Sequence, residues 1–159
     1  MQPLDGENLV LLPPLPCRAE RILQLRRDVF FPGQSIQQAR YPGDDDPRAC
    51  HFAGCVRYAN DRAEHLVACT SLLVDRYEGE PAWRVRGLCV AEGYRGMGIG
   101  GRFMQEVARR ICLDTPVHVM WCAAKDDAHG FFERLGWQMV DEVYLLQGSG
   151  THFCRVPVE

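Results

Sequence analysis

Five glycines lie close together in AEGYRGMGIGGRFM, residues 91–104, where the chain passes into a segment with helical periodicity. Each glycine inside a regular element costs roughly 0.5–1 kcal/mol of stability relative to alanine. One or two glycines are enough for a tight turn, so five indicate that bare backbone is required there. Backbone N–H groups at a helix N-terminus attract anions, because they lack intrahelical acceptors and the helix dipole favours negative charge. The stretch therefore predicts a phosphate-binding loop.

Three kinds of phosphate-binding loop can be compared with this stretch. A Walker loop is excluded, because no G-x-x-x-x-G-K-[ST] sequence is present. Gly96, Gly98 and Gly101 satisfy the dinucleotide pattern G-x-G-x-x-G, but the residues AEGYR separate the preceding strand from the glycines. A nicotinamide-dependent oxidoreductase that uses this pattern stays open as an alternative. The third kind of phosphate-binding loop is recognised only together with a second motif elsewhere in the sequence.

The composition of the chain limits its architecture and its partners. A length of 159 residues corresponds to one domain, which we place at residues 7–159. The net charge of −3 does not favour nucleic-acid binding, and no apolar run approaches the roughly 18 residues of a membrane helix. The start, MQPLDGENLVLLPPLP, lacks the basic region of a signal peptide. We expect a cytoplasmic protein without nucleic-acid or membrane partners, and a homodimer stays open.

The eight cysteines are scattered along the chain, and no C-x-x-C pair is present. Most of them lie in apolar, strand-like segments, where a free cysteine behaves as a small hydrophobic residue. We therefore expect reduced thiols, no disulfide framework and no metal site.

The hydrophobic periodicity of the chain predicts a mixed α/β fold. Strands are expected at residues 8–12, 50–58, 65–77, 82–90, 117–123, 138–147 and 151–158. Helices are expected at residues 16–30, 100–112 and 126–137. This order predicts a central, mixed but mostly antiparallel sheet of about seven strands, with helices on both faces.

Two motifs together resemble those of the GNAT acetyltransferases. RGMGIG, residues 95–100, is similar to the family signature R/Q-x-x-G-x-G/A. AAKDDAHGFFERLGW, residues 123–137, is similar to the family's A-x-x-F-Y-x-x-x-G-F helix, and THFCRV, residues 151–156, resembles its last strand. The resemblance covers nearly the whole chain and implies a GNAT fold in a bacterial-type member.

This resemblance implies an acetyl-coenzyme A-dependent N-acetyltransferase. We expect this chain to transfer the acetyl group to a primary amine by direct attack in a ternary complex, with a small-molecule or peptide amine as the acceptor. A member that only binds acyl-coenzyme A is the alternative within the family. The loop amides are expected to bind the pyrophosphate, and the preceding strand is expected to bind the pantetheine arm. The implied cofactor-binding residues are Leu88, Cys89, Val90, Arg95, Gly96, Met97, Gly98, Ile99, Gly100, Gly101 and Phe131.

The catalytic groups usual in the family are missing from their positions. Where the second motif often carries a tyrosine that protonates the leaving thiolate, this chain has Phe132, so Tyr144 becomes a candidate acid. The strand before the glycine loop carries no glutamate to act as a base. His51 and His152 are the candidate catalytic histidines, and water is the alternative base.

Three consecutive aspartates, Asp44–Asp46, allow two interpretations. Clustered negative charge can attract a cationic amine towards the acceptor site. The alternative is a solvated turn without a role in binding.

Overall fold

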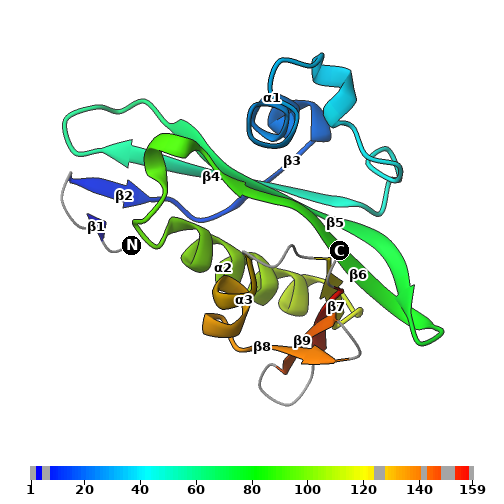
Figure 1. Ribbon diagram of the computed structural model, residues 1–159. Helices are drawn as coiled ribbons and strands as arrows, with labels where there is room; N and C mark the ends of the chain where they lie inside the picture. The colour runs from blue at the N-terminus through cyan, green and yellow to red at the C-terminus, as the bar shows by residue number, and fades with distance from the viewer. Residues whose placement is uncertain (1–2, 5–7, 124–127, 141–142, 148–152, 158–159) are drawn as a thin grey trace.

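The computed structural model describes residues 3–4, 8–123, 128–140, 143–147 and 153–157 (Figure 1). Within these residues, ten strands form one sheet in the order β1-β2-β4-β5-β6-β7-β10-β9-β8, and β3 pairs with β4. The strands are β1 (Pro3–Leu4), β2 (Leu9–Leu11), β3 (Leu15–Cys17), β4 (Cys50–Tyr58), β5 (His65–Tyr77), β6 (Glu80–Val90), β7 (Val119–Cys122), β8 (Trp137–Val140), β9 (Val143–Gln147) and β10 (Phe153–Pro157).

Helices cover both faces of this sheet. The helices are α1 (Ala19–Phe30), α2 (Ile99–Asp114) and α3 (His129–Arg134), with 3-10 turns η1 (Ile36–Ala39) and η2 (Glu92–Tyr94). Figure 1 shows α1 on one side of β4, β5 and β6, and α2 and α3 on the other. The α/β class and the helices on both faces are confirmed.

The sheet is mostly antiparallel, as predicted, but β7 is parallel to both of its neighbours, β6 and β10. It has three more strands than the seven predicted. Two of these, β1 and β3, are short segments near the N-terminus, and β3 replaces the expected first turn of α1. The third arises because residues 138–147 were predicted as one strand. The structure instead has an antiparallel hairpin of β8 and β9, in which Val140 pairs with Val143.

The edges of β6 differ in how far they are paired. On one side β6 stays paired with β5 as far as Val90, which lies opposite Ala68. On the other side only residues 83–85 pair with residues 120–122 of β7. Within the described residues, the segment 86–90 of β6 therefore has a free edge facing the gap that β7 leaves.

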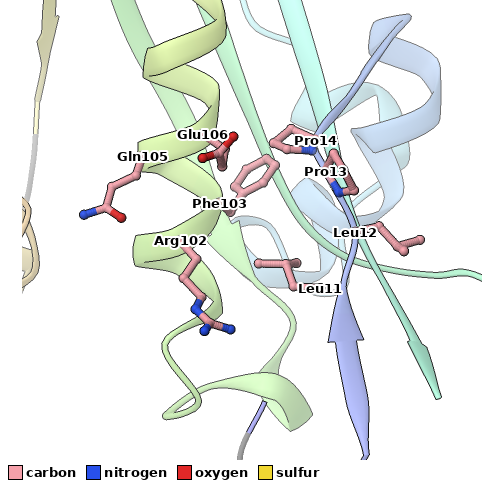
Figure 2. Close-up of a pocket in the computed structure, with 8 residues that line it drawn as sticks. All are labelled: Leu11, Leu12, Pro13, Pro14, Arg102, Phe103, Gln105 and Glu106. Atoms are coloured by element: carbon pink, nitrogen blue, oxygen red, sulfur yellow. The ribbon is translucent and has the colours of Figure 1, made fainter. Parts of the chain in front are cut away.

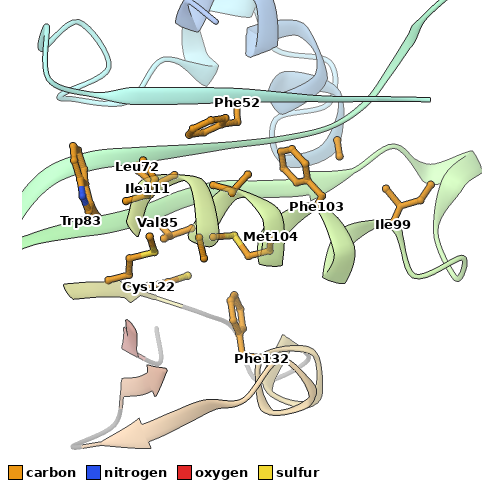
Figure 3. Close-up of a cluster of buried hydrophobic side chains, with 14 of the residues drawn as sticks. Phe52, Leu72, Trp83, Val85, Ile99, Phe103, Met104, Ile111, Cys122 and Phe132 are labelled. Atoms are coloured by element: carbon orange, nitrogen blue, oxygen red, sulfur yellow. The ribbon is translucent and has the colours of Figure 1, made fainter. Parts of the chain in front are cut away.

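A hydrophobic core fills the space between the sheet and the helices α2 and α3 (Figure 3). The apolar stripe of α2 explains its position, since Phe103, Met104, Val107 and Ile111 recur at helical spacing and are buried. Full burial of each such side chain contributes roughly 1.5–3 kcal/mol. This packing fixes the start of α2, and with it the glycine loop, against β6.

The contact between β4 and α2 gives a stability prediction. A Cβ atom at Gly54 would lie 2.9 Å from both the Ala68 Cβ and the Phe103 Cδ1 atoms, so Gly54→Ala should overpack the core. We expect a loss of roughly 1–3 kcal/mol, or a decrease in Tm of roughly 3–10 °C for a domain of this size. Gly93→Ala is the matched control, because nothing lies within 4 Å of its Cβ position. Equal thermal melting of the two variants would contradict this packing.

Candidate active site

The free edge of β6 borders a cavity of about 740 Å3. Small-molecule sites typically have volumes of roughly 300–1,000 Å3. The walls come from both faces of the sheet, because the end of α1 contributes on one face and α2 and α3 contribute on the other. The cavity therefore connects the two faces where β6 and β7 separate. Its lining residues are Val29, Phe30, Phe31, Tyr41, Val85, Arg86, Gly87, Leu88, Cys89, Val90, Arg95, Gly100, Cys122, Ala123, Ala128, Phe131 and Phe132.

The glycine loop lies at one end of this cavity. Gly98 is the N-cap of α2 with φ of 77°, and no side chain caps the helix there. The first intrahelical bond runs from the Arg102 N–H to the Gly98 carbonyl, at 3.2 Å. The amides that precede Arg102 in the first turn, from Ile99 to Gly101, therefore have no acceptor within the helix. The predicted helix N-terminus with bare backbone is present.

Gly100 lets α2 approach β6 and α3. A Cβ atom on it would lie 3.3 Å from the Val90 Cγ2 and Phe131 Cε2 atoms. The Arg95 guanidinium is exposed nearby and donates from Nε to the Val90 carbonyl at 3.0 Å. The structure thus brings the loop, the end of β6 and α3 together at the glycine-loop end of the cavity.

The residues expected to bind the cofactor divide into two groups. Those that line the cavity are Leu88, Cys89, Val90, Arg95, Gly100 and Phe131. The others form the loop and the first turn of α2 without lining the cavity: Gly96, Met97, Gly98, Ile99 and Gly101. In this second group, Ile99 is fully buried in the core.

A bulge in β6 lies near the other end of the cavity. The register between β5 and β6 shifts between Cys69 and Ser71, which lie opposite Cys89 and Arg86. Gly87, inside this bulge, has φ of +65°, and a Cβ atom on it would lie 2.9 Å from the Arg26 Nε atom. Gly87 was not among the predicted site residues, although a lone glycine inside a strand is a known signal of a bulge or of close approach.

Arg26 fills the space above this bulge and is completely buried. Its Nη1 group donates to the Asp44 Oδ2 atom at 2.7 Å and to the Ala39 carbonyl at 2.8 Å, and its Nη2 group donates to the Ser71 hydroxyl. A buried charge is tolerated only with such partners. The network ties α1, the loop after η1 and β5 into one unit behind the cavity.

His51 belongs to the same network. Its Nδ1 atom lies 2.6 Å from the Ser71 Oγ atom, and its Nε2 atom lies 3.0 Å from the Asp44 carbonyl oxygen. The ring is buried and does not line the cavity. This candidate catalytic histidine therefore lies among structural hydrogen bonds.

The aspartate cluster is engaged with arginines of the chain. Asp44 pairs with buried Arg26, the Asp45 Oδ1 atom lies 2.9 Å from the Arg40 Nη1 atom, and Asp46 pairs with Arg48. Hydrogen bonds from the Arg48 side chain and backbone hold the pKa of Asp46 below its usual value. The cluster does not line the cavity, so the interpretation that it attracts a cationic acceptor loses its basis.

The remaining candidates fall at the edge of the described structure. His152 lies outside the described residues, and Tyr144 lies in β9, opposite Met139 and Val156. Phe132, which stands where the family often has tyrosine, is buried, and its ring centroid is 4.9 Å from that of Trp137. The structure therefore gives Phe132 a packing role.

Seven cysteines are free thiols: Cys17, Cys50, Cys55, Cys69, Cys89, Cys112 and Cys122. Cys69 and Cys89 lie side by side, with 3.5 Å between their Sγ atoms. This hydrogen bond, followed by burial, raises the pKa of the Cys69 thiol above its ordinary value. Burial also raises the pKa values of the thiols of Cys17, Cys50, Cys55 and Cys112. These five thiols stay protonated at neutral pH.

A second cavity, of about 340 Å3, lies beside α2 (Figure 2). Its walls are the chain that leaves β2 and one side of the first turns of α2, and it shares no residue with the larger cavity. The described residues include no metal-binding group of three or more His, Cys, Asp or Glu side chains. No helix in the described part of the chain has the length and apolarity needed to cross a membrane.

The comparison with known families shows which family this chain belongs to. A family model described as acetyltransferase (GNAT) family matches residues 19–137. The chain belongs to the GNAT acetyltransferase family. The match includes both sequence motifs, residues 95–100 and 123–137, so the resemblance that they carried is confirmed.

Individual relatives of this GNAT chain agree with that result. Uncharacterized N-acetyltransferase YitI of Bacillus subtilis (strain 168) is 26% identical over 139 residues, which cover 84% of this chain and 87% of YitI. Escherichia coli ElaA has a TM-score of 0.58 and 22% identity, over 92% of this chain and 97% of ElaA. Arabidopsis thaliana NAA60, in complex with a bisubstrate analogue, has a TM-score of 0.58 and 20% identity, over 92% of this chain and 94% of NAA60. The solved structures share the fold of this GNAT chain.

The buried ion pair behind the cavity gives a second stability prediction. Asp44→Asn should leave the Arg26 charge uncompensated and cost roughly 3–5 kcal/mol in urea unfolding. Asp45→Asn is the matched control, because its carboxylate is 80% exposed and its pair should contribute less than about 1 kcal/mol. Adding Arg26→Met to Asp44→Asn should recover part of the loss. Similar losses for the two aspartate variants would contradict the described burial.

Proposed function

We propose that this chain transfers an acetyl group from acetyl-coenzyme A to a primary amine by direct attack in a ternary complex. The observation that carries the proposal is the cavity that connects the glycine loop on one face of the sheet with α1 on the other. Such a cavity would let two substrates bind from opposite faces of the sheet, with their reacting groups in contact beside β6. The bisubstrate analogue bound to NAA60 is consistent with this arrangement in a protein of the same fold.

The coenzyme would occupy the glycine-loop end. The amides of residues 96–101 would bind the pyrophosphate, with the charge of Arg95 close by. The free backbone edge of Leu88–Val90 would bind the amide groups of the pantetheine arm, because no described strand uses that edge. Phe131, whose ring lies beside Gly100 together with Val90, would contact the pantetheine arm at the glycine-loop end of the cavity.

The reaction needs little from the protein beyond positioning. The neutral amine nitrogen attacks the thioester carbonyl carbon, a C–N bond forms, and the C–S bond breaks as the thiolate leaves with the bonding electrons. The proton lost by nitrogen passes to water, and the thiolate is later protonated by water. The described lining residues include no Asp, Glu or His, which favours water over a side-chain base. A thiolate with a pKa of roughly 8.5 is a fair leaving group without an acid at Phe132.

Direct attack predicts the absence of an acetyl-enzyme. Cys89, which lies in the segment proposed to bind the arm, has its thiol 3.5 Å from the Cys69 thiol. Intact-mass spectrometry after incubation with acetyl-coenzyme A alone should show no added acetyl group. Initial-rate plots with an accepted amine should intersect. A stoichiometric acetyl adduct together with parallel plots would replace the ternary complex with a two-step mechanism.

The glycine loop predicts how coenzyme binding responds to substitution. Gly98→Val should strain the left-handed backbone at φ of 77° and displace the amides that face the pyrophosphate. Losing one such charge-assisted hydrogen bond weakens binding by roughly 10- to 100-fold. Calorimetry with acetyl-coenzyme A should show this loss for Gly98→Val and unchanged affinity for Gly93→Ala. Normal affinity in Gly98→Val would remove the pyrophosphate from this loop.

Thermal-shift titration with acetyl-coenzyme A, coenzyme A and NADH tests the proposal against its rivals. A ligand at 100 times its Kd stabilises the folded state by about 2.7 kcal/mol. Stabilisation by both coenzyme A forms, with thiol release when amines are added, is the expected result. Stabilisation without thiol release across an amine panel would indicate a protein that only binds acyl-coenzyme A. Stabilisation by NADH alone would overturn the proposed function. The free thiols of the described residues support a reducing, cytoplasmic location as part of the proposal.

A further inference from the structure

The end of the cavity opposite the glycine loop carries positive charge. Arg86 and Arg95 are the only charged side chains among the described lining residues. Arg95 lies at the glycine-loop end, where it contacts the Val90 carbonyl. Arg86 lies on the face of α1 and Tyr41, where an acceptor would enter. An amine acceptor would therefore meet a cation and no described carboxylate.

Arg86 is held in place by an aromatic ring rather than by an acid. Its guanidinium carbon lies 4.1 Å from the centroid of the Tyr41 ring. The same ring is 4.1 Å from the guanidinium carbon of Arg26, which the buried network fixes. Stacking uses the flat face of a guanidinium and leaves its in-plane N–H donors available. Tyr41 thus orients the Arg86 guanidinium and leaves its N–H groups able to donate to a ligand.

The two arginines on Tyr41 differ in their charge compensation. Arg26 has Asp44 as a partner at 2.7 Å. Arg86 is half-buried, and no carboxylate of the described residues lies within 4.0 Å of its guanidinium nitrogens. A partly buried guanidinium without an anion has lost part of its hydration, and a bound anion would compensate for that loss. Its planar fork matches the two oxygens of a carboxylate.

We infer that the acceptor is an amine that also carries a carboxylate, and that Arg86, oriented by Tyr41, binds this carboxylate. The inference rests on the proposed function and names its substrate class. The same positive charge disfavours the ammonium form of a bound amine and so favours the neutral nucleophile. It also disfavours polyamines, whose several positive charges would face Arg86 without a compensating acid.

The test compares amines that differ only in the anionic group. Free amino acids and dipeptides, their carboxamides, aminoalkyl phosphonates and spermidine are assayed for thiol release from acetyl-coenzyme A. We expect acetylation of carboxylate-bearing amines and weak acetylation of the corresponding carboxamides. Arg86→Gln should lower kcat/KM for the carboxylates by roughly 10- to 100-fold, mainly through KM, and leave the carboxamides unchanged. Arg86→Lys should restore part of the loss, because it keeps the charge without the fork.

Two controls separate this effect from damage to the fold or to the coenzyme site. Arg109→Gln removes an exposed arginine from the far side of α2 and should behave as the unchanged protein. Calorimetry should show equal acetyl-coenzyme A affinity for Arg86→Gln and the unchanged protein. Equal rates for carboxylates and carboxamides, or a preference for spermidine or phosphonates, would overturn the inference and leave the proposed function intact.

If no amine is acetylated, a binding experiment tests the carboxylate site on its own. Protein saturated with coenzyme A is then titrated with N-acetylated amino acids and with their amides. Binding of the acids alone, lost in Arg86→Gln, would support the carboxylate site although the proposed transfer had failed. Absence of binding, or equal binding of the acids and amides, would overturn the inference as well.

Discussion

The free edge of β6 is the constraint on which the rest of this structure depends. Hydrogen bonds to β5 hold the strand as far as Val90, whereas pairing with β7 ends at Val85. Unpaired backbone groups at a buried edge require partners, so the edge must be covered by a ligand, by water or by another segment. The larger cavity of this GNAT protein lies at that edge, and both proposed substrates would bind in this cavity beside β6.

The two faces of the sheet hold this edge by different forces. On one face, apolar packing of α2 and α3 places the glycine loop, and the absence of a side chain at Gly100 permits the close approach. On the other face, a buried charge network holds α1 against the sheet. Arg26 packs over Gly87 and links α1 to Asp44 and Ser71. The apolar side sets where the coenzyme would lie. The polar side sets the shape and charge of the acceptor end.

The sequence was informative wherever the determining pattern is local. Helical periodicity, the crowded glycines and the alternation within strands predicted the α/β class, the helices on both faces and the bare N-terminus of α2. The acceptor end was less predictable. Arg26 interrupts the apolar stripe of Ile22 and Leu23, which marks it as unusual, but its partner Asp44 lies 18 residues away in an irregular loop. Only the tertiary structure brings these two together.

The strand boundaries show a similar division. Residues 138–147 have a continuous strand-like composition, so the hairpin of β8 and β9 was predicted as one strand; periodicity does not reveal where a chain reverses. The bulge at Gly87 had a visible signal, but its meaning depends on Arg26 and Tyr41 from other elements. Where residues far apart in the sequence form a site together, its geometry can be seen only in the folded structure.

The most direct measurement of the central claim is a crystal structure of the complex with coenzyme A. The account predicts that the pyrophosphate contacts the amides of residues 96–101 and that the pantetheine arm bonds to the free edge of Leu88–Val90. The sulfur would then lie in the gap between β6 and β7, with the Tyr41 and Arg86 end of the cavity open to an acceptor. Coenzyme A bound in the smaller cavity between Leu11 and Glu106, or an arm that makes no bond to β6, would contradict the account.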